Sequence, residues 1–261
     1  MAIPSLVVTP KTAVAAASFL TILLLEGWRP LFPLKKDRWH HLARNATITV
    51  IASVVVYLLF SSVKLLVEAQ VRANGWGLLG AVPLTGLLRT TVVVVLFDAW
   101  MYLWHRMNHR IRILWRFHRV HHTDDAMDVS TAWRFHPGEL VLSTAAGLFI
   151  ITLLGLTLQD LLVYETLMLP VIYLHHSDFY LPGRVDRLLR TVLVTPWMHW
   201  VHHSNKGREL NSNYGSILSV WDRIGGSFRL RDDPDAIVYG VKGFEDEGWQ
   251  TVAGMLRTPL A

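Results

Sequence analysis

The sequence predicts an all-α integral membrane protein, a helical bundle of about four to five spans with a histidine-rich cap on the cytoplasmic side. Hydrophobic residues make up 52% of the 261 residues and charged residues only 17%, which is more apolar than a typical soluble domain. Several apolar runs approach the length of about 20 residues with which a helix crosses a bilayer. Histidines gather at the ends of these runs, and we expect them to carry the function.

Five apolar runs are the candidate membrane segments, and in chain order they cover residues 12–28, 46–67, 87–104, 140–158 and 161–174. The first is interpreted as an uncleaved span, because Lys11 is the only charged residue before it and no clear small-x-small cleavage site follows it. The last run is short and contains Glu165 and Pro170, so we expect a re-entrant or tilted segment there. A turn at Gln159 and Asp160 is expected to separate the last two runs.

The distribution of Lys and Arg predicts the orientation of the spans. If the basic loop 29–44 lies in the cytoplasm, then segments 105–137 and 175–261 lie there too. These three segments carry 5, 6 and 10 of the 25 Lys and Arg residues, as the positive-inside rule requires. The same assignment places every clustered histidine on the cytoplasmic side. In the absence of a retention signal, we expect the bacterial inner membrane rather than the endoplasmic reticulum.

Eight of the thirteen histidines fall into three short clusters with helical spacing. Residues three or four apart project from one face of a helix, so each cluster presents its imidazoles together. The clusters are His105 and His109; His118, His121 and His122; and His199, His202 and His203.

This pattern predicts a metal centre with nitrogen ligands. The chain has no cysteine, so a metal must be held by nitrogen and oxygen, and imidazole suits iron, zinc, copper and nickel. Two metals without a bridging carboxylate need about eight to ten protein donors. The alternative, eight histidines that only make hydrogen bonds, would bury a costly set of polar groups. Metal binding is therefore the favoured interpretation.

The motifs around these histidines resemble a known family. HRMNH at 105–109, HRVHH at 118–122 and HWVHH at 199–203 are similar to the three histidine boxes of the sterol desaturase and fatty acid hydroxylase superfamily. TAWRFHPGE at 131–139, HHSD at 175–178 and NSNYGSILSVWDR at 211–223 match as well. The resemblance covers roughly residues 90–258, a catalytic domain that follows N-terminal spans and a basic loop in residues 1–89. One departure is Ile224 before Gly225, where the family commonly has an aromatic residue.

The resemblance implies a membrane oxidoreductase in lipid biosynthesis, with two iron ions and O2 as co-substrate. Such an enzyme hydroxylates or desaturates a sterol, fatty acyl or related lipid in the bilayer. Electrons would come from a separate ferredoxin, or from cytochrome b5 with its reductase, and no nucleic acid partner is expected. The implied ligands are the eight clustered histidines together with His176. His136 is a further candidate, equally a ligand or a neighbour of one, and His175 is expected to be a hydrogen-bonding neighbour.

No catalytic residue is expected beyond the metal centre, but four polar residues are candidates to support it. They are Asp98, Tyr102, Asn213 and Asp222. Asp98 precedes His105 by two helical turns on the same face, so its carboxylate could orient that imidazole or a neighbouring one. A structural use of Asp98 is nearly as plausible from the sequence alone.

Two other functions stay open at this point. A zinc-dependent membrane hydrolase needs a general base, but HRMNH lacks the glutamate of the HExxH proteases, and only Glu139 and Glu209 offer a carboxylate near the boxes. A non-catalytic protein that binds a metal or haem would need histidines facing each other inside the bilayer. The clusters lie instead at the ends of spans and in the polar C-terminal region.

Overall fold

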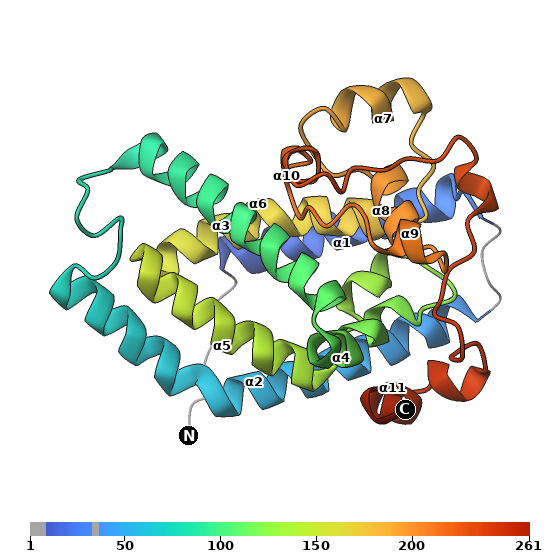
Figure 1. Ribbon diagram of the computed structural model, residues 1–261, viewed down its shortest axis with the longest axis horizontal. Helices are drawn as coiled ribbons and strands as arrows, with labels where there is room; N and C mark the ends of the chain where they lie inside the picture. Colours follow the sequence, from blue (N-terminus) through green and yellow to red (C-terminus); the bar gives the residue numbers. More distant parts are fainter. Residues whose placement is uncertain (1–8, 33–36) are drawn as a thin grey trace.

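The computed structural model describes residues 9–32 and 37–261 of the protein. Five long helices run as an elongated bundle (Figure 1): α1 (Pro10–Trp28), α2 (Arg38–Asn74), α3 (Gly86–Arg110), α5 (Pro137–Leu154) and α6 (Leu158–His176). α2 packs against α5, and α6 packs against α1 and α3. The described ranges contain isolated β-bridges but no β-strand. The predicted all-α class is confirmed.

Short helices and loops form a cap at one end of the bundle (Figure 1). In chain order these helices are α4 (Arg112–His122), η1 (Val129–Trp133), α7 (Gly183–Leu189), α8 (Pro196–His202), α9 (Gly207–Leu210), α10 (Val220–Ile224), η2 (Pro234–Ala236), η3 (Glu247–Gln250), α11 (Val252–Arg257) and η4 (Thr258–Leu260).

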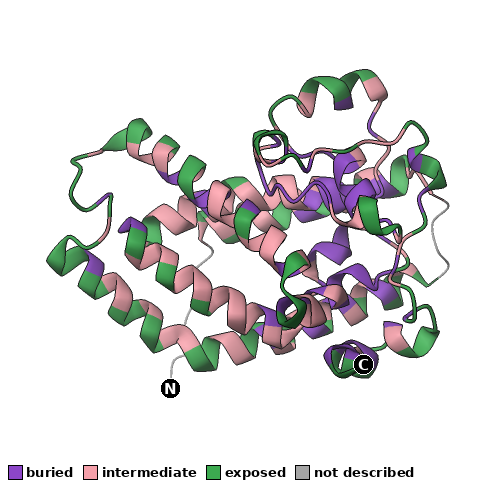
Figure 2. Ribbon diagram, in the orientation of Figure 1, coloured by how far each residue is buried: buried purple, intermediate pink, exposed green. Residues whose placement is uncertain are grey.

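Four of the long helices, α1, α2, α3 and α5, are long and apolar enough to cross a membrane. Their apolar windows are only 6% to 22% buried within the protein. Large side chains such as Leu58, Leu87 and Phe149 are mostly exposed, and exposed and half-buried residues alternate along the bundle (Figure 2). Apolar surface on this scale needs lipid around it. The protein is therefore an integral membrane protein, while the cytoplasmic side of its cap stays a prediction.

The turn between the last two apolar runs lies earlier than expected. α5 ends at Leu154, and Gly155 caps it in the left-handed conformation with φ 72°. Gln159 and Asp160, the predicted turn, lie instead in the first turn of α6. The Thr157 side chain accepts from the Asp160 backbone, and the Asp160 carboxylate accepts from the Thr157 backbone. This reciprocal capping starts α6 three residues before the predicted apolar run.

Residues 161–174 belong to this continuous helix, which runs through Pro170 to His176. At 19 residues it is about 28 Å long, although it is not one of the four apolar candidates. Its C-terminal end brings His175 and His176 into the buried part of the cap.

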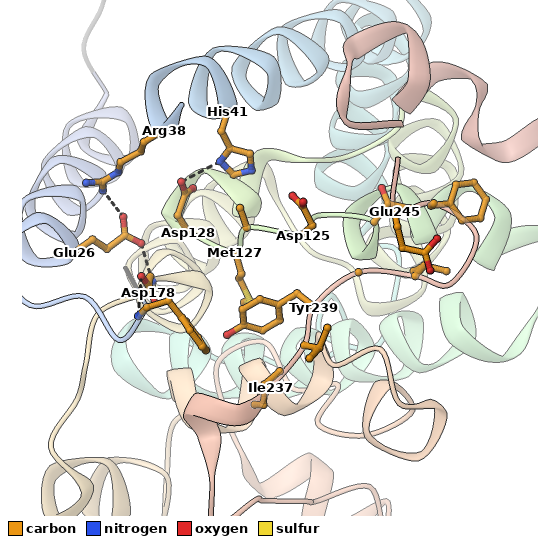
Figure 3. Close-up of a pocket in the computed structure, with 17 residues that line it drawn as sticks. Glu26, Arg38, His41, Asp125, Met127, Asp128, Asp178, Ile237, Tyr239 and Glu245 are labelled. Carbon is orange, nitrogen blue, oxygen red and sulfur yellow. Dashed lines mark hydrogen bonds and ion pairs between the residues drawn. The ribbon is translucent and has the colours of Figure 1, made fainter. Parts of the chain in front are cut away.

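A buried polar network joins α1, α2, η1 and the end of α6 beside a cavity of about 450 Å³ (Figure 3). The Glu26 carboxylate accepts from the backbones of Val129 and Asp178 and from Arg38. From its place in the basic loop 29–44, the sequence predicts that His41 faces solvent or lipid headgroups. In the structure it is buried and bonded to two carboxylates, those of Asp124 and Asp128. The expectation for His41 was wrong because both partners come from a loop more than eighty residues away. These pairs fix the α1–α2 end of the bundle to the cap.

Candidate metal centre

Nine histidines come together in two neighbouring groups inside the cap. Within each group, one ring nitrogen of every residue lies within 4.8 Å of all the others. The first group is His105, His109, His118, His122 and His202, and the second is His121, His176, His199 and His203. Rings of the two groups stack on each other, with centroids of His122 and His203 4.4 Å apart. The set comprises the eight clustered histidines and His176.

Helical spacing decides which group each imidazole joins. On α4, His118 and His122 are four residues apart and share the first group, whereas His121 points to the second. At α8, His199 and its partner His203 share the second group, whereas His202 joins the first. Residues four apart lie one above the other on a helix, and the residue between them is rotated away. Each triplet therefore contributes to both groups.

Four of the nine imidazole rings are oriented by a hydrogen bond at Nδ1, which leaves Nε2 directed toward the other histidines of the group. His105 Nδ1 lies 3.0 Å from the Tyr214 carbonyl oxygen, His202 Nδ1 lies 2.6 Å from that of Ser212, and His176 Nδ1 lies 2.8 Å from that of Ile172. A carbonyl only accepts, so Nδ1 carries the proton and donates it. Nε2 is then left with a free lone pair, the state in which imidazole binds a metal.

A carboxylate holds the fourth ring. Glu139 Oε1 lies 2.6 Å from His118 Nδ1, and both side chains are buried. This is the histidine–carboxylate contact that commonly orients metal-bound imidazoles. From the sequence, Glu139 is a candidate only for the base of a hydrolase, because nothing in the local sequence links it to a histidine 21 residues earlier.

The Nε2 atoms converge at distances expected for ligands of one ion. His118 Nε2 lies 3.1 Å from His109 Nε2 and 3.2 Å from His122 Nε2. In the second group, His199 Nε2 lies 2.9 Å from His176 Nε2 and 3.1 Å from His203 Nε2. Two nitrogens that each bind a metal at about 2.1 Å, at right angles, are about 3.0 Å apart. The spacing fits a shared ion in each group.

Unpaired buried nitrogens are a second sign that the residues fit metal ions. His105 Nε2 and His202 Nε2 are buried and have no hydrogen-bond partner within the described ranges. An unpaired buried polar atom costs about 1–3 kcal/mol, and a metal removes that cost. The five nitrogens of the first group also exceed the four of an ordinary structural zinc site, which favours a metal of higher coordination number such as iron.

The buried imidazoles are kept neutral, as metal ligands must be. Burial, with a smaller effect from neighbouring imidazoles, lowers the pKa of His202 to about 3. The same two causes hold the pKa well below its usual value for four further residues, His121, His122, His199 and His203.

These depressed pKa values predict how the stability of the metal-free protein depends on pH. In the unfolded chain the imidazoles take up protons below about pH 6.5, whereas in the folded chain they resist protonation. Stability is therefore complete above about pH 6.5 and is lost progressively as the pH falls toward the folded values. Thermal unfolding of the metal-free protein in detergent, measured from pH 8 to pH 4, should show a falling midpoint. A midpoint that stays constant across this range would contradict the burial of neutral imidazoles.

Asp98 is not in contact with His105. Its carboxylate accepts hydrogen bonds from the backbones of Ile217 and Leu218, from Trp221 Nε1 and from the Tyr164 hydroxyl. The expected contact fails because seven residues of helix place Asp98 about 10 Å along the axis from His105. Asp98 instead fixes the segment that follows the Tyr214 carbonyl.

Tyr102, Asn213 and Asp222 shape the loop that carries the two supporting carbonyls of Ser212 and Tyr214. The Asp222 carboxylate accepts from the backbones of Tyr214 and Gly215. Asn213 takes a left-handed conformation with φ 50° and donates its amide to Met198. The Tyr102 hydroxyl pairs with Ser227. The contacts of all three residues involve this loop or the segments beside it, and we expect them to position the two carbonyls.

His136 and His175, the other two histidines considered for the site, lie outside both groups. His136 caps the start of α5, where its Nδ1 accepts from the Gly138 backbone, and its ring packs on Phe117. His175 is buried against His199 with centroids 4.1 Å apart. It was expected to be a hydrogen-bonding neighbour, but neither ring nitrogen has a partner in the described part of the chain.

A Glu139→Ala variant should bind the metal of the first group about 10–100-fold more weakly, because losses of this size follow removal of a carboxylate behind a ligating histidine. Metal affinity can be measured by competition with a chelator. Glu139→Gln keeps an acceptor for His118 Nδ1 and should retain more of the affinity. Equal metal binding in wild type and Glu139→Ala would show that this contact does not support the site.

Together these features define a membrane helical bundle with a buried polyhistidine centre in its cap. The fatty acid hydroxylase family model matches residues 90–227, more than half of the chain and all nine grouped histidines. The chain therefore belongs to the fatty acid hydroxylase family, and the resemblance seen in the motifs is confirmed. No solved structure gives a significant match.

Several characterised proteins are similar to this chain. Ornithine lipid hydroxylase OlsE of Rhizobium tropici is 30% identical over 60% of the chain and 46% of its own length. Human alkylglycerol monooxygenase is 29% identical over 55% of the chain and 31% of its own length. Cholesterol 25-hydroxylase of Rattus norvegicus is 24% identical over 63% of the chain and 54% of its own length. The matched region thus spans about half or less of each relative.

Proposed function

We propose that this chain is a membrane lipid hydroxylase that holds two irons on nine histidines and uses O2 with electrons from a separate donor. The observation that carries the proposal is the convergence of nine imidazole nitrogens into groups of five and four beside apolar helices. Family membership and the names of the similar proteins support it. Those names also favour hydroxylation over desaturation.

Iron held by histidine supplies O2 activation strong enough to break an unactivated C–H bond. The balance of the reaction is one substrate C–H and one O2, with two electrons and two protons, giving one C–OH and one water. The two electrons would be supplied by a separate donor protein, and the chain has no cysteine with which to hold an iron–sulfur cluster. A ferredoxin, or cytochrome b5 with its reductase, fits this need.

The protein's own residues orient the ligands and limit the access of water. The carbonyls of Tyr214, Ser212 and Ile172 keep the proton on Nδ1 of three rings, so that their Nε2 atoms face the metal. Seven of the nine rings are buried, which protects a reactive centre from solvent. A lipid substrate would reach the centre from the bilayer, between the spans. The distribution of Lys and Arg supports a centre on the cytoplasmic side of the membrane.

Both carboxylates that the sequence offers as the base of a zinc hydrolase already bind other groups in the structure. Glu139 is bonded to His118 Nδ1, and Glu209 is bonded to Ser204 and Arg231. A haem between two histidines is also disfavoured, because Nε2 atoms 2.9–3.2 Å apart leave no room for a porphyrin between them.

The test is a comparison of lipids from cells that express the wild type or His121→Ala, grown under oxygen-18 gas. We expect lipids in the wild-type cells that have gained one oxygen carrying the heavy isotope, and none in the variant. A new lipid whose added oxygen comes from water would contradict an O2-dependent hydroxylase.

A further inference from the structure

One histidine of the metal centre, His109, reaches the surface in an open hollow of about 680 Å³. Only His105 and His109 among the nine grouped histidines are partly exposed, and His109 lines this hollow. The other lining residues come from the end of α3, from α9 and from the loop after α10; they are Arg110, Gly207, Arg208, Asn211, Gly226 and Arg229. α9 and the end of α3 lie near each other in Figure 1.

The hollow is strongly cationic. Arg110, Arg208 and Arg229 are exposed, and no Asp or Glu of the described ranges lines the hollow with them. The guanidinium of Arg110 binds the Tyr214 hydroxyl. Those of Arg208 and Arg229 make no hydrogen bond or ion pair within the described part of the chain. Two free positive charges therefore stand beside an edge of the centre.

The character of the lining argues against entry of the lipid substrate here. An acyl or sterol chain would need apolar walls, and this hollow is lined only by arginine, histidine, asparagine and glycine. Electron transfer does not require an apolar lining. It needs a short path to the metal, which the exposed edge of His109 provides, since His109 Nε2 lies 3.1 Å from His118 Nε2 in the first group.

We propose that the surface formed by Arg110, Arg208 and Arg229 around His109 is the docking site of an acidic one-electron carrier protein. This inference rests on the proposed function, which requires an external donor. Complementary charge brings the two proteins together and speeds their encounter. In each encounter the carrier loses one electron and the metal centre gains it, so two encounters supply one hydroxylation.

The experiment compares the iron-loaded wild type with Arg208→Glu/Arg229→Glu in detergent. Binding of two acidic carriers, a plant-type [2Fe–2S] ferredoxin and the soluble domain of cytochrome b5, is measured at low and at high ionic strength. The wild type should bind at least one of them at low ionic strength, and the variant should bind it at least tenfold more weakly. The difference should shrink at high ionic strength, because salt screens exposed charges.

Two further variants control for folding and for total charge. Arg208→Gln/Arg229→Gln removes the charges without reversing them and should bind with intermediate affinity. Arg184→Glu/Arg187→Glu makes the same change of charge on exposed residues of α7, which does not line the hollow, and should bind like the wild type.

Photoreduction by deazaflavin, a small uncharged reductant, separates this inference from the proposed function. All four proteins should be reduced equally by deazaflavin, whereas reduction by the carrier should slow only in the two variants of the hollow. A wild type without reducible iron would overturn the proposed function. A wild type that binds neither carrier, or equal binding by wild type and Arg208→Glu/Arg229→Glu, would overturn the docking site.

Discussion

His121→Ala and His202→Ala are each expected to lose one iron and to hydroxylate lipid at least about a hundredfold more slowly than the wild type, since small displacements of reacting groups already cost about that much. His202 belongs to the first group and His121 to the second, so each variant should retain the iron of the other group more firmly. Iron content per chain and the yield of hydroxylated lipid in cells are the two measurements.

The matched control is His136→Ala. His136 lies outside both groups and caps α5, so this variant should keep its iron and its activity, with a small loss of stability from the cap. Loss of both irons in His136→Ala, or full iron content in His121→Ala and His202→Ala, would contradict the assignment of ligands.

Asp98→Ala is expected to lower the free energy of unfolding by at least about 3 kcal/mol, because it leaves four buried neutral donors without an acceptor and each such donor costs about 1–3 kcal/mol. The Asp98 side chain is fully buried and accepts four hydrogen bonds, two of them from the backbones of Ile217 and Leu218. Without it, the segment that follows Tyr214 loosens, and the Tyr214 carbonyl no longer fixes His105. Thermal unfolding in detergent measures the first effect, and chelator competition for iron measures the second.

Asp98→Asn provides the comparison for this prediction. Ile217 donates to Oδ1 and Leu218 to Oδ2, so the single acceptor oxygen of the amide keeps one of these two contacts. Both effects should therefore be smaller than in Asp98→Ala. If Asp98→Ala unfolds at the wild-type temperature, Asp98 does not have the anchoring role that its contacts indicate.

The sequence was sufficient to predict the fold class, the apolar helices and the family. These features are local: apolar runs define the helices, and a helical repeat places histidines on one face, as at His118 and His122. The sequence was also sufficient to predict that the eight clustered histidines and His176 come together. Which residues from other helices each part of a triplet meets could not be predicted, because that depends on how separate helices pack in space.

The contacts behind the ligands could not be predicted for a physical reason. Tyr214, Ser212 and Ile172 act through backbone carbonyls, which every residue possesses. Glu139 and His41 act through side chains, but their partners lie far away in the chain. Periodicity describes one helix at a time and contains no information about such long-range pairs. Asp98 was correctly singled out as an inward polar residue, yet its partners were the backbone of a distant segment.

The most direct test of the central claim is Mössbauer spectroscopy of protein from cells grown on iron-57, before and after exposure to O2, together with total metal analysis. We expect about two irons per chain that O2 oxidises to a magnetically coupled ferric pair, since the two histidine groups adjoin each other. Iron-free protein whose activity follows native zinc, and which gains nothing from reconstitution with iron, would contradict the account.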